Sequence, residues 1–109
     1  MIPSQMLKGI LEGCILSIIA QEETYGYEIS EKLKAIGFGE ISEGTIYPML
    51  LRLTKNEYIE ARVKSSNSGP SRKYYSLTKL GKSELELFES SFLELVKAVN
   101  NLIGGKHHE

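Results

Sequence analysis

Residues 42–78 constrain the fold of this 109-residue chain more than any other stretch. They contain an amphipathic helical pattern, a partly alternating segment at 58–64, a polar turn at 65–71 and an aromatic-rich segment at 73–77. Short alternating or aromatic-rich segments on either side of a Gly/Pro turn predict two β-strands joined in a hairpin. We therefore expect a helix that is followed directly by a β-hairpin.

A proline decides where we place the start of that helix. If Ser42 capped one continuous helix, Pro48 would fall beyond the first turn and remove an internal hydrogen bond, at a cost of about 3 kcal/mol. With Thr45 as the N-cap, Pro48 lies in the first turn, where no donor is missed. We expect the regular helix at 46–55, and a tight turn from Ser42 can precede it. Its core-facing positions are Ile46, Met49, Leu50 and Leu53.

Two further helices are expected before this one. Apolar residues at helical spacing predict a first helix over 5–21. Gly9 and Gly13 lie on one side of it and each costs about 1 kcal/mol relative to alanine, which close approach of another helix would justify. A merely tolerated pair of glycines is the alternative. Thr24 is expected to cap a second helix over 25–36. Three helices and a hairpin predict a mainly α fold with a small β-hairpin (α+β), a winged helix-turn-helix.

The last part of the chain predicts one long helix. Residues 78–103 give a helix of roughly 26 residues, about 39 Å long. Its apolar residues alternate spacings of three and four, the pattern of a coiled-coil seam. That seam consists of Leu85, Phe88, Phe92, Leu95, Val99 and Leu102. It extends beyond any core this chain could build, so we expect a second copy to cover it. A monomer with a folded-back helix is the alternative.

The positive charge of the chain is local. The formal net charge is −1, yet residues 24–83 hold more Lys and Arg than Glu. Arg62, Lys64, Arg72 and Lys73 bracket the polar turn with no carboxylate between them. Such a cluster is typical of a nucleic-acid-binding surface, and a solvated face is the alternative.

Catalysis, metal binding and cofactor binding find little support in the sequence. The chain has no aspartate, its two histidines are His107 and His108 in the tail, and its single cysteine, Cys14, is expected to be a buried apolar residue. We expect no enzyme and no cofactor. The absence of a signal-peptide pattern and of a spanning apolar run predicts a cytoplasmic protein. The tail histidines are either native or remnants of a cloning tag.

The start of the predicted recognition helix suits a phosphate. Free backbone amides and the positive end of the helix dipole favour an anion beside Ser42 and Thr45, whose hydroxyls add donors. Gly44 lets that backbone come close to a ligand. Tyr47, next to Pro48, offers either a phosphate-positioning contact or a packing role.

Further basic residues are candidates for contacts with the DNA backbone. Arg52 is expected to face outward and to reach a phosphate, or to form a surface ion pair. Arg72 and Lys73 leave the hairpin turn beside Lys64, where they could follow phosphates along a minor groove. These contacts would make the hairpin a wing.

Four segments resemble the PadR family of bacterial transcriptional regulators. They are LKGILEG (7–13), TYGYEISEKL (24–33), ISEGTIYPMLLRL (41–53) and GPSRKYYSLTKLG (69–81). The resemblance implies a homodimeric repressor that binds double-stranded DNA at an inverted-repeat operator and is released by a small-molecule effector of unknown identity. It places the DNA-facing elements at Ser42, Gly44, Thr45, Tyr47, Pro48, Arg72 and Lys73.

The resemblance also implies a domain organisation. Residues 1–78 would form the winged helix-turn-helix DNA-binding domain, 79–104 the C-terminal dimerisation helix of a short subfamily, and 105–109 a disordered tail. The first helix, with Gly9 and Gly13, would also contribute to the dimer interface by packing against the final helix of the partner. Some short members bind flat aromatic compounds by means of tryptophan, which this chain lacks, so Phe88 and Phe92 are candidates for a substitute wall or for plain core. The alternative function is a winged-helix module that docks a protein and does not bind DNA; the basic wing argues against it.

Overall fold

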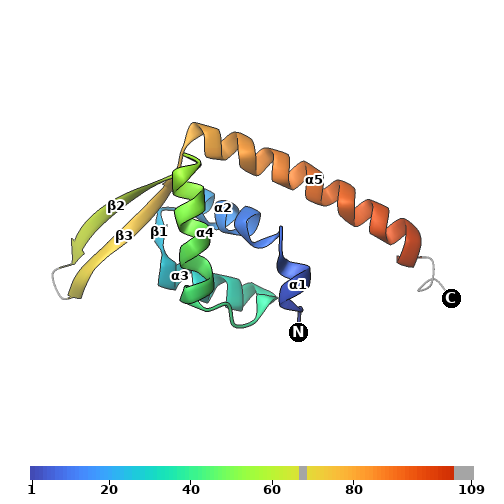
Figure 1. Cartoon of the computed structure of the whole chain (residues 1–109), viewed down its shortest axis with the longest axis horizontal. Coiled ribbons are helices and arrows are strands. Elements are labelled where there is room, and N and C mark those ends of the chain that lie inside the picture. The colour runs from blue at the N-terminus through green and yellow to red at the C-terminus, as the bar shows by residue number, and fades with distance from the viewer. Residues whose placement is uncertain (67–68, 105–109) are drawn as a thin grey trace.

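The chain folds into a helical body, a projecting hairpin and a long C-terminal helix (Figure 1). The computed structural model describes residues 1–66 and 69–104. The elements are α1 (Ser4–Leu7), α2 (Leu11–Gln21), β1 (Thr24–Tyr25), α3 (Gly26–Leu33), η1 (Lys34–Phe38), α4 (Glu43–Lys55), β2 (Ile59–Ser66), β3 (Gly69–Leu77) and α5 (Lys79–Ile103). The predicted fold class, mainly helical with a small sheet, is confirmed. The tail at 105–109, with both histidines, and part of the predicted turn lie outside the described residues.

The sheet is antiparallel, with strand order β1-β3-β2. Strands β2 and β3 form the predicted hairpin, hereafter the wing, and are longer than expected. Strand β1 was not predicted. It pairs Thr24 with Tyr75 and Tyr25 with Tyr74. The prediction that Thr24 caps a helix is therefore wrong: Thr24 is a fully buried strand residue, and Tyr25 takes the N-cap position of α3 without a side-chain cap bond.

The predicted first helix is interrupted. It divides into α1 and α2, and Gly9 between them has a φ of +86°, in the left-handed region that glycine adopts without strain. Gly9 and Gly13 thus do not share one helix face. A Cβ at Gly9 would meet no atom within 4 Å, whereas a Cβ at Gly13 would lie 2.3–2.4 Å from the ring of Phe88 in α5. The close approach that Gly13 permits is to a helix of its own chain.

Helix α4 begins earlier than predicted. Ser42, not Thr45, is the N-cap, and its Oγ accepts a hydrogen bond from the Thr45 amide at 3.2 Å. Pro48 consequently lies inside the helix, on its exposed side. The loss of one solvent-facing hydrogen bond is offset by the cap and by the burial of the apolar face. The predicted core positions are confirmed, since Ile46, Leu50 and Leu53 are buried and Met49 packs against them.

The core lies between helices α2, α3 and α4 and one face of the sheet. Ile15 and Leu16 of α2 and Leu33 of α3 are buried there. The sheet contributes Ile59 and Tyr75. Cys14 is half-buried against this core, and burial raises the pKa of its thiol. Among the described residues, no helix combines the length and the apolar character that crossing a membrane requires.

Helix α5 begins and ends close to its predicted bounds, with Thr78 as its N-cap. Leu85 is buried, and Phe88 packs against the core. Beyond residue 90 the helix extends away from the body (Figure 1), and every described residue is exposed up to Ile103. We call its exposed apolar stripe the distal seam, which consists of Phe92, Leu95, Val99 and Leu102. Within one chain, the predicted seam is thus covered at its start and bare at its end.

Candidate nucleic-acid interface

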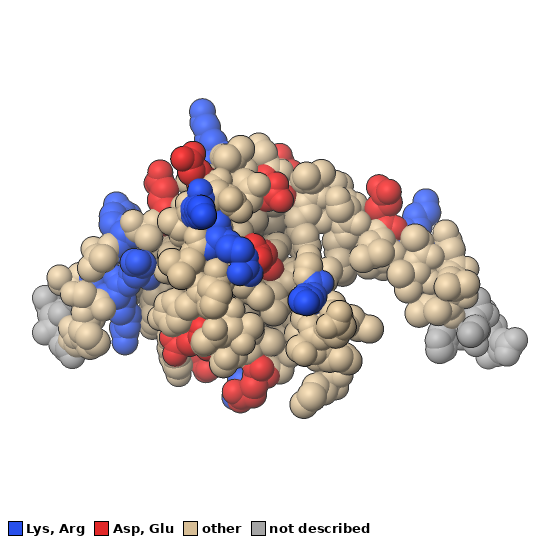
Figure 2. Space-filling model, viewed as in Figure 1, with Lys and Arg blue, Asp and Glu red and all other residues tan. Residues whose placement is uncertain are grey.

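A cleft opens between the wing and the first turns of α3 and α4. It brings together three segments that are distant in sequence. Its lining residues are Tyr25, Gly26, Tyr27, Glu43, Tyr47, Ser71, Arg72 and Lys73. Three of the predicted DNA-facing residues, Tyr47, Arg72 and Lys73, therefore meet at one place. The charge distribution agrees, because Lys and Arg atoms gather over the wing while few charged atoms cover the far part of α5 (Figure 2).

The first turn of α4 forms an open corner beside this cleft. Ser42, Gly44 and Thr45 are all exposed, and the Ser42 and Thr45 hydroxyl oxygens lie 3.1 Å apart. A Cβ at Gly44 would meet nothing closer than the Ser42 Oγ at 3.7 Å, so the backbone here is accessible to a ligand. The amides that precede the first intrahelical bond have no helical acceptor. The corner therefore offers hydrogen-bond donors at the positive end of a helix dipole.

Tyr47 connects α4 to the start of α3. Its ring lies against Gly26, where a Cβ would come within 3.2 Å of the phenol oxygen. Its hydroxyl donates to the Glu43 carboxylate at 3.3 Å, and 47% of the residue remains exposed. Burial, together with the charge of Glu43, raises the pKa of the Tyr47 hydroxyl. The group therefore stays a hydrogen-bond donor at neutral pH, packed on one side and accessible on the other.

The basic residues of the wing are divided between its two faces. Neighbouring strand residues point to opposite faces, so Arg72 and Lys73 border the cleft from opposite faces of β3. The Arg72 guanidinium lies 4.7 Å from the centre of the Tyr25 ring. Lys64, opposite Arg72 in the ladder, forms an ion pair with Glu23. Lys73 lies on the other face and is exposed.

Arg52 forms a surface ion pair, which was the alternative to its predicted contact with a phosphate. Its Nη2 lies 2.8 Å and its Nε 3.1 Å from one carboxylate oxygen of Glu12 in α2. Arg52 does not line the cleft. Its predicted contact with phosphate thus has a competing partner within the chain.

Sequence reasoning missed several residues at this site. Tyr27 is 53% exposed at the start of α3, and Gly26 leaves room for the Tyr47 ring. The signal for Tyr27 was a large aromatic residue in a first helical turn whose neighbours Ile29 and Leu33 form the core face. Glu23 and Arg62 were also missed as partners, because their pairing depends on the position of β1.

Comparison with known proteins identifies the family. The model of the Transcriptional regulator PadR-like family matches residues 15–87, which include most of α2, the elements from β1 to α4, the wing and the first part of α5. The chain belongs to the PadR-like family of transcriptional regulators. The predicted family and the predicted class of protein are both confirmed.

Solved structures of PadR-like regulators are similar to this chain in sequence and in fold. A PadR-like transcriptional regulator from Bacillus cereus is 56% identical, with 91% of this chain and 96% of that chain covered and a TM-score of 0.82. PadR from Bacillus subtilis, solved in complex with operator DNA, is 32% identical over 71% of this chain and 45% of that chain, with a TM-score of 0.64. A curated relative from Lysinibacillus sphaericus, an uncharacterized protein, is 34% identical over 107 residues, which are 96% of this chain and 98% of the relative.

Proposed function

We propose that this PadR-like regulator represses transcription by binding an inverted-repeat operator as a homodimer, and that a small-molecule effector releases it. One observation carries the DNA-binding part. Tyr47 and the wing residues Arg72 and Lys73 line one cleft together with Glu43 of the first turn of α4. The other residues of that turn, Ser42, Gly44 and Thr45, are exposed next to Glu43. Helix N-termini, hydroxyls and basic side chains are the groups that position proteins on a DNA backbone. The operator complex of the similar Bacillus subtilis protein supports the same assignment.

In this proposal the two elements that flank the cleft have different tasks. Helix α4 places its N-terminal residues at the major groove, and Ser42, Gly44 and Thr45 hold a phosphate at its rim. The wing follows the adjacent backbone, with Lys73 nearest the duplex. Tyr47 releases Glu43 and donates its hydroxyl proton to a phosphate, while its ring stays packed against Gly26 at the start of α3.

The distal seam supports the homodimer. Its residues repeat with coiled-coil spacing, and none of them is buried by the chain itself. Two copies that pack these stripes against each other bury both at once and create a two-fold axis. That symmetry places two wings and two α4 helices on one side of a duplex, which is why the proposed operator is an inverted repeat.

The effector part of the proposal concerns the middle of α5. The rings of Phe88 and Phe92 are stacked, with centroids 6.1 Å apart. Phe88 packs on Gly13, whereas Phe92 is exposed at the start of the distal seam. A flat apolar molecule between paired α5 helices would meet these rings and change the spacing of the wings.

Binding to the DNA upstream of the gene, measured by fluorescence anisotropy across a salt series, tests the proposal. Arg72→Ala with Lys73→Ala should weaken binding to all sequences and reduce the salt slope by about two units, because two phosphate contacts are lost. Lys79→Ala with Lys82→Ala removes the same charge at the base of α5 and should leave the slope unchanged. A wild-type protein that binds no promoter fragment would support the protein-docking module instead.

A further inference from the structure

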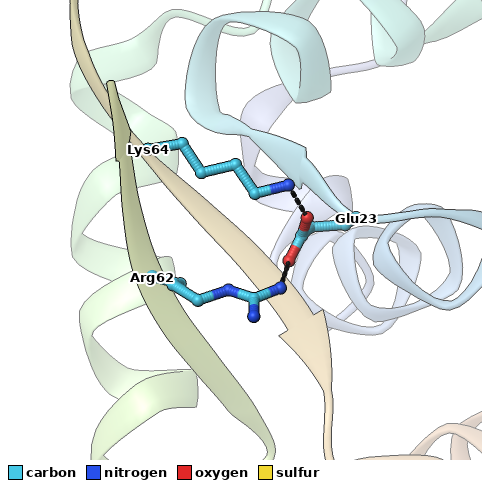
Figure 3. A network of polar contacts seen from close by, with 3 residues as sticks. All are labelled: Glu23, Arg62 and Lys64. Atoms are coloured by element: carbon cyan, nitrogen blue, oxygen red, sulfur yellow. Dashed lines mark hydrogen bonds and ion pairs between the residues drawn. The ribbon is translucent and has the colours of Figure 1, made fainter. Parts of the chain in front are cut away.

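The outer face of the sheet carries a charged network that the proposed DNA contacts do not use. Glu23, in the segment between α2 and β1, points across the sheet toward strand β2 (Figure 3). Its Oε2 accepts from the Arg62 guanidinium at 2.8 Å, and its Oε1 accepts from the Lys64 ammonium. Each carboxylate oxygen thus has its own cation, and both cations belong to the wing.

The strand register shows that this network lies on one face. Arg62 is opposite Tyr74, and Lys64 is opposite Arg72. Tyr74 is in turn opposite Tyr25 of β1. Directly paired residues share a face, so these side chains lie together, on the face opposite to the buried Tyr75. The cations held by Glu23 therefore point away from the face that carries Lys73.

The network joins the wing to the body beyond the last backbone pairing. The ladder between β1 and β3 ends at Tyr25 and Tyr74. The next ladder pair on this face, Lys64 and Arg72, is tied to the body through side chains: Lys64 bonds Glu23, and Arg72 lies over the Tyr25 ring. Farther out, among the residues that the structure describes, the strands are exposed on both faces. The direction of the wing tip thus depends on these contacts.

The burial of the three charged groups is uneven. The side chain of Glu23 is only 23% exposed, whereas that of Arg62 is 71% exposed. Hydrogen bonds from Lys64 and Arg62 lower the pKa of the Glu23 carboxyl, so the group remains ionised at neutral pH. The carboxylate is the least exposed member of the cluster, since the side chain of Lys64 is 46% exposed.

We propose that Glu23 is a positioning residue for operator recognition, which holds the wing in the direction that operator binding requires through Arg62 and Lys64. This inference rests on the proposed function. In it, Arg62 and Lys64 act on operator binding through the placement of the wing and not as phosphate contacts. Glu23 consequently sets the ratio between specific and non-specific DNA binding, since non-specific binding depends on charge and tolerates a wing that moves.

The variant Glu23→Gln tests this role, with Glu22→Gln as its matched control. Both changes remove one negative charge from the same turn, but Glu22 pairs with Lys32 of α3 and not with the wing. Glu23→Gln should lower affinity for the operator by about fivefold to tenfold. Its affinity for an unrelated duplex at the same salt should stay equal or rise by about twofold, because two cations are freed. The control should change the ratio of the two affinities by less than about twofold.

Three results would overturn the proposal. A parallel fall in both affinities would mean that Glu23 supports only the fold. A parallel rise would mean that Glu23 merely competes with phosphates for its cations. Unchanged affinities for both duplexes would mean that the wing does not need it.

A measurement without DNA separates this inference from the proposed function. Relaxation of ¹⁵N amides in β2 and β3 should show lower order parameters in Glu23→Gln than in the wild type, and no change in Glu22→Gln. If the wild type binds no operator, the proposed function fails, while the relaxation data still decide whether Glu23 holds the wing. Unchanged order parameters in Glu23→Gln would refute the positioning role in either case.

Discussion

The two halves of α5 have the same hydrophobic periodicity but different partners. In the first half, Leu85 is buried and the Phe88 ring lies against Gly13 of α2. In the second half, Leu95 is 52% exposed and Val99 43% exposed, although both continue the same spacing. A heptad pattern thus indicates that a stripe needs a cover, but not which chain provides it. Here the change occurs between Phe88 and Phe92.

Because their partners differ, the first half of α5 contributes to the free energy of folding and the second half would contribute to the free energy of association. Burial of the first half contributes to folding of the single chain, because its partners are α2 and the hairpin base. Burial of the distal seam would contribute to association. Substitutions in the first half should therefore change the free energy of unfolding, and substitutions in the distal seam should change the dissociation constant of the dimer.

The largest effect is expected for Leu95→Glu in the distal seam. A carboxylate would be placed in an apolar interface twice, once from each copy. The dissociation constant of the dimer should rise at least about 100-fold, and operator binding should be lost with it. Sedimentation velocity over a concentration series measures the first quantity, and a gel shift measures the second. Val99→Glu should behave in the same way.

Leu93→Glu is the matched control for this variant. Leu93 is exposed, apolar and on the same stretch of α5, but it falls outside the spacing of the seam. It should remain dimeric. If Leu95→Glu also remains dimeric, or if Leu93→Glu dissociates as well, the seam has been placed on the wrong face of the helix.

A smaller effect, on folding alone, is expected for Gly81→Ala in the first half. A Cβ at Gly81 would lie 1.9 Å from the Tyr58 carbonyl oxygen, and a backbone atom cannot move aside as a side chain can. The free energy of unfolding should fall by about 3 kcal/mol, measured by urea denaturation at fixed protein concentration. The exposed neighbour Ser83→Ala should change it by less than about 0.5 kcal/mol.

The contrast between the halves also shows which parts of the fold a sequence can predict. The bounds of α5 and the buried face of α4 were correct, because hydrophobic spacing is a local property that survives into the structure. Strand β1 was missed because two residues, Thr24 and Tyr25, are too short to show a pattern. They become a strand only because β3 offers them a free edge. The sequence does not reveal the N-cap of α4, because the packing of α4 against the core, which offsets the cost of Pro48 inside the helix, is a tertiary property.

The same limit applies to the candidate site: the residue types can be predicted from the sequence, but their tertiary partners cannot. Tyr47, Arg72 and Lys73 could be predicted from residue type and position, and they do border one cleft. The ion pairs of Arg52 with Glu12 and of Lys64 with Glu23 join residues forty or so positions apart, so they depend on tertiary structure. The sequence thus predicts which side chains carry charge. It does not predict which of them already have a partner.

The smallest effect is expected for Thr78→Ala at the start of α5. The Thr78 Oγ1 accepts from the Gly81 amide at 2.9 Å and donates to the Glu57 carbonyl at 2.6 Å. Losing both bonds should lower the free energy of unfolding by about 1 kcal/mol, while Thr78→Ser, which keeps the hydroxyl, should recover most of it. The dimer dissociation constant, measured under native conditions, should stay within about twofold, because the distal seam begins more than three turns away. A loss of dimer affinity that matches the loss of stability would show that α5 acts as one unit and that its halves are not energetically separate.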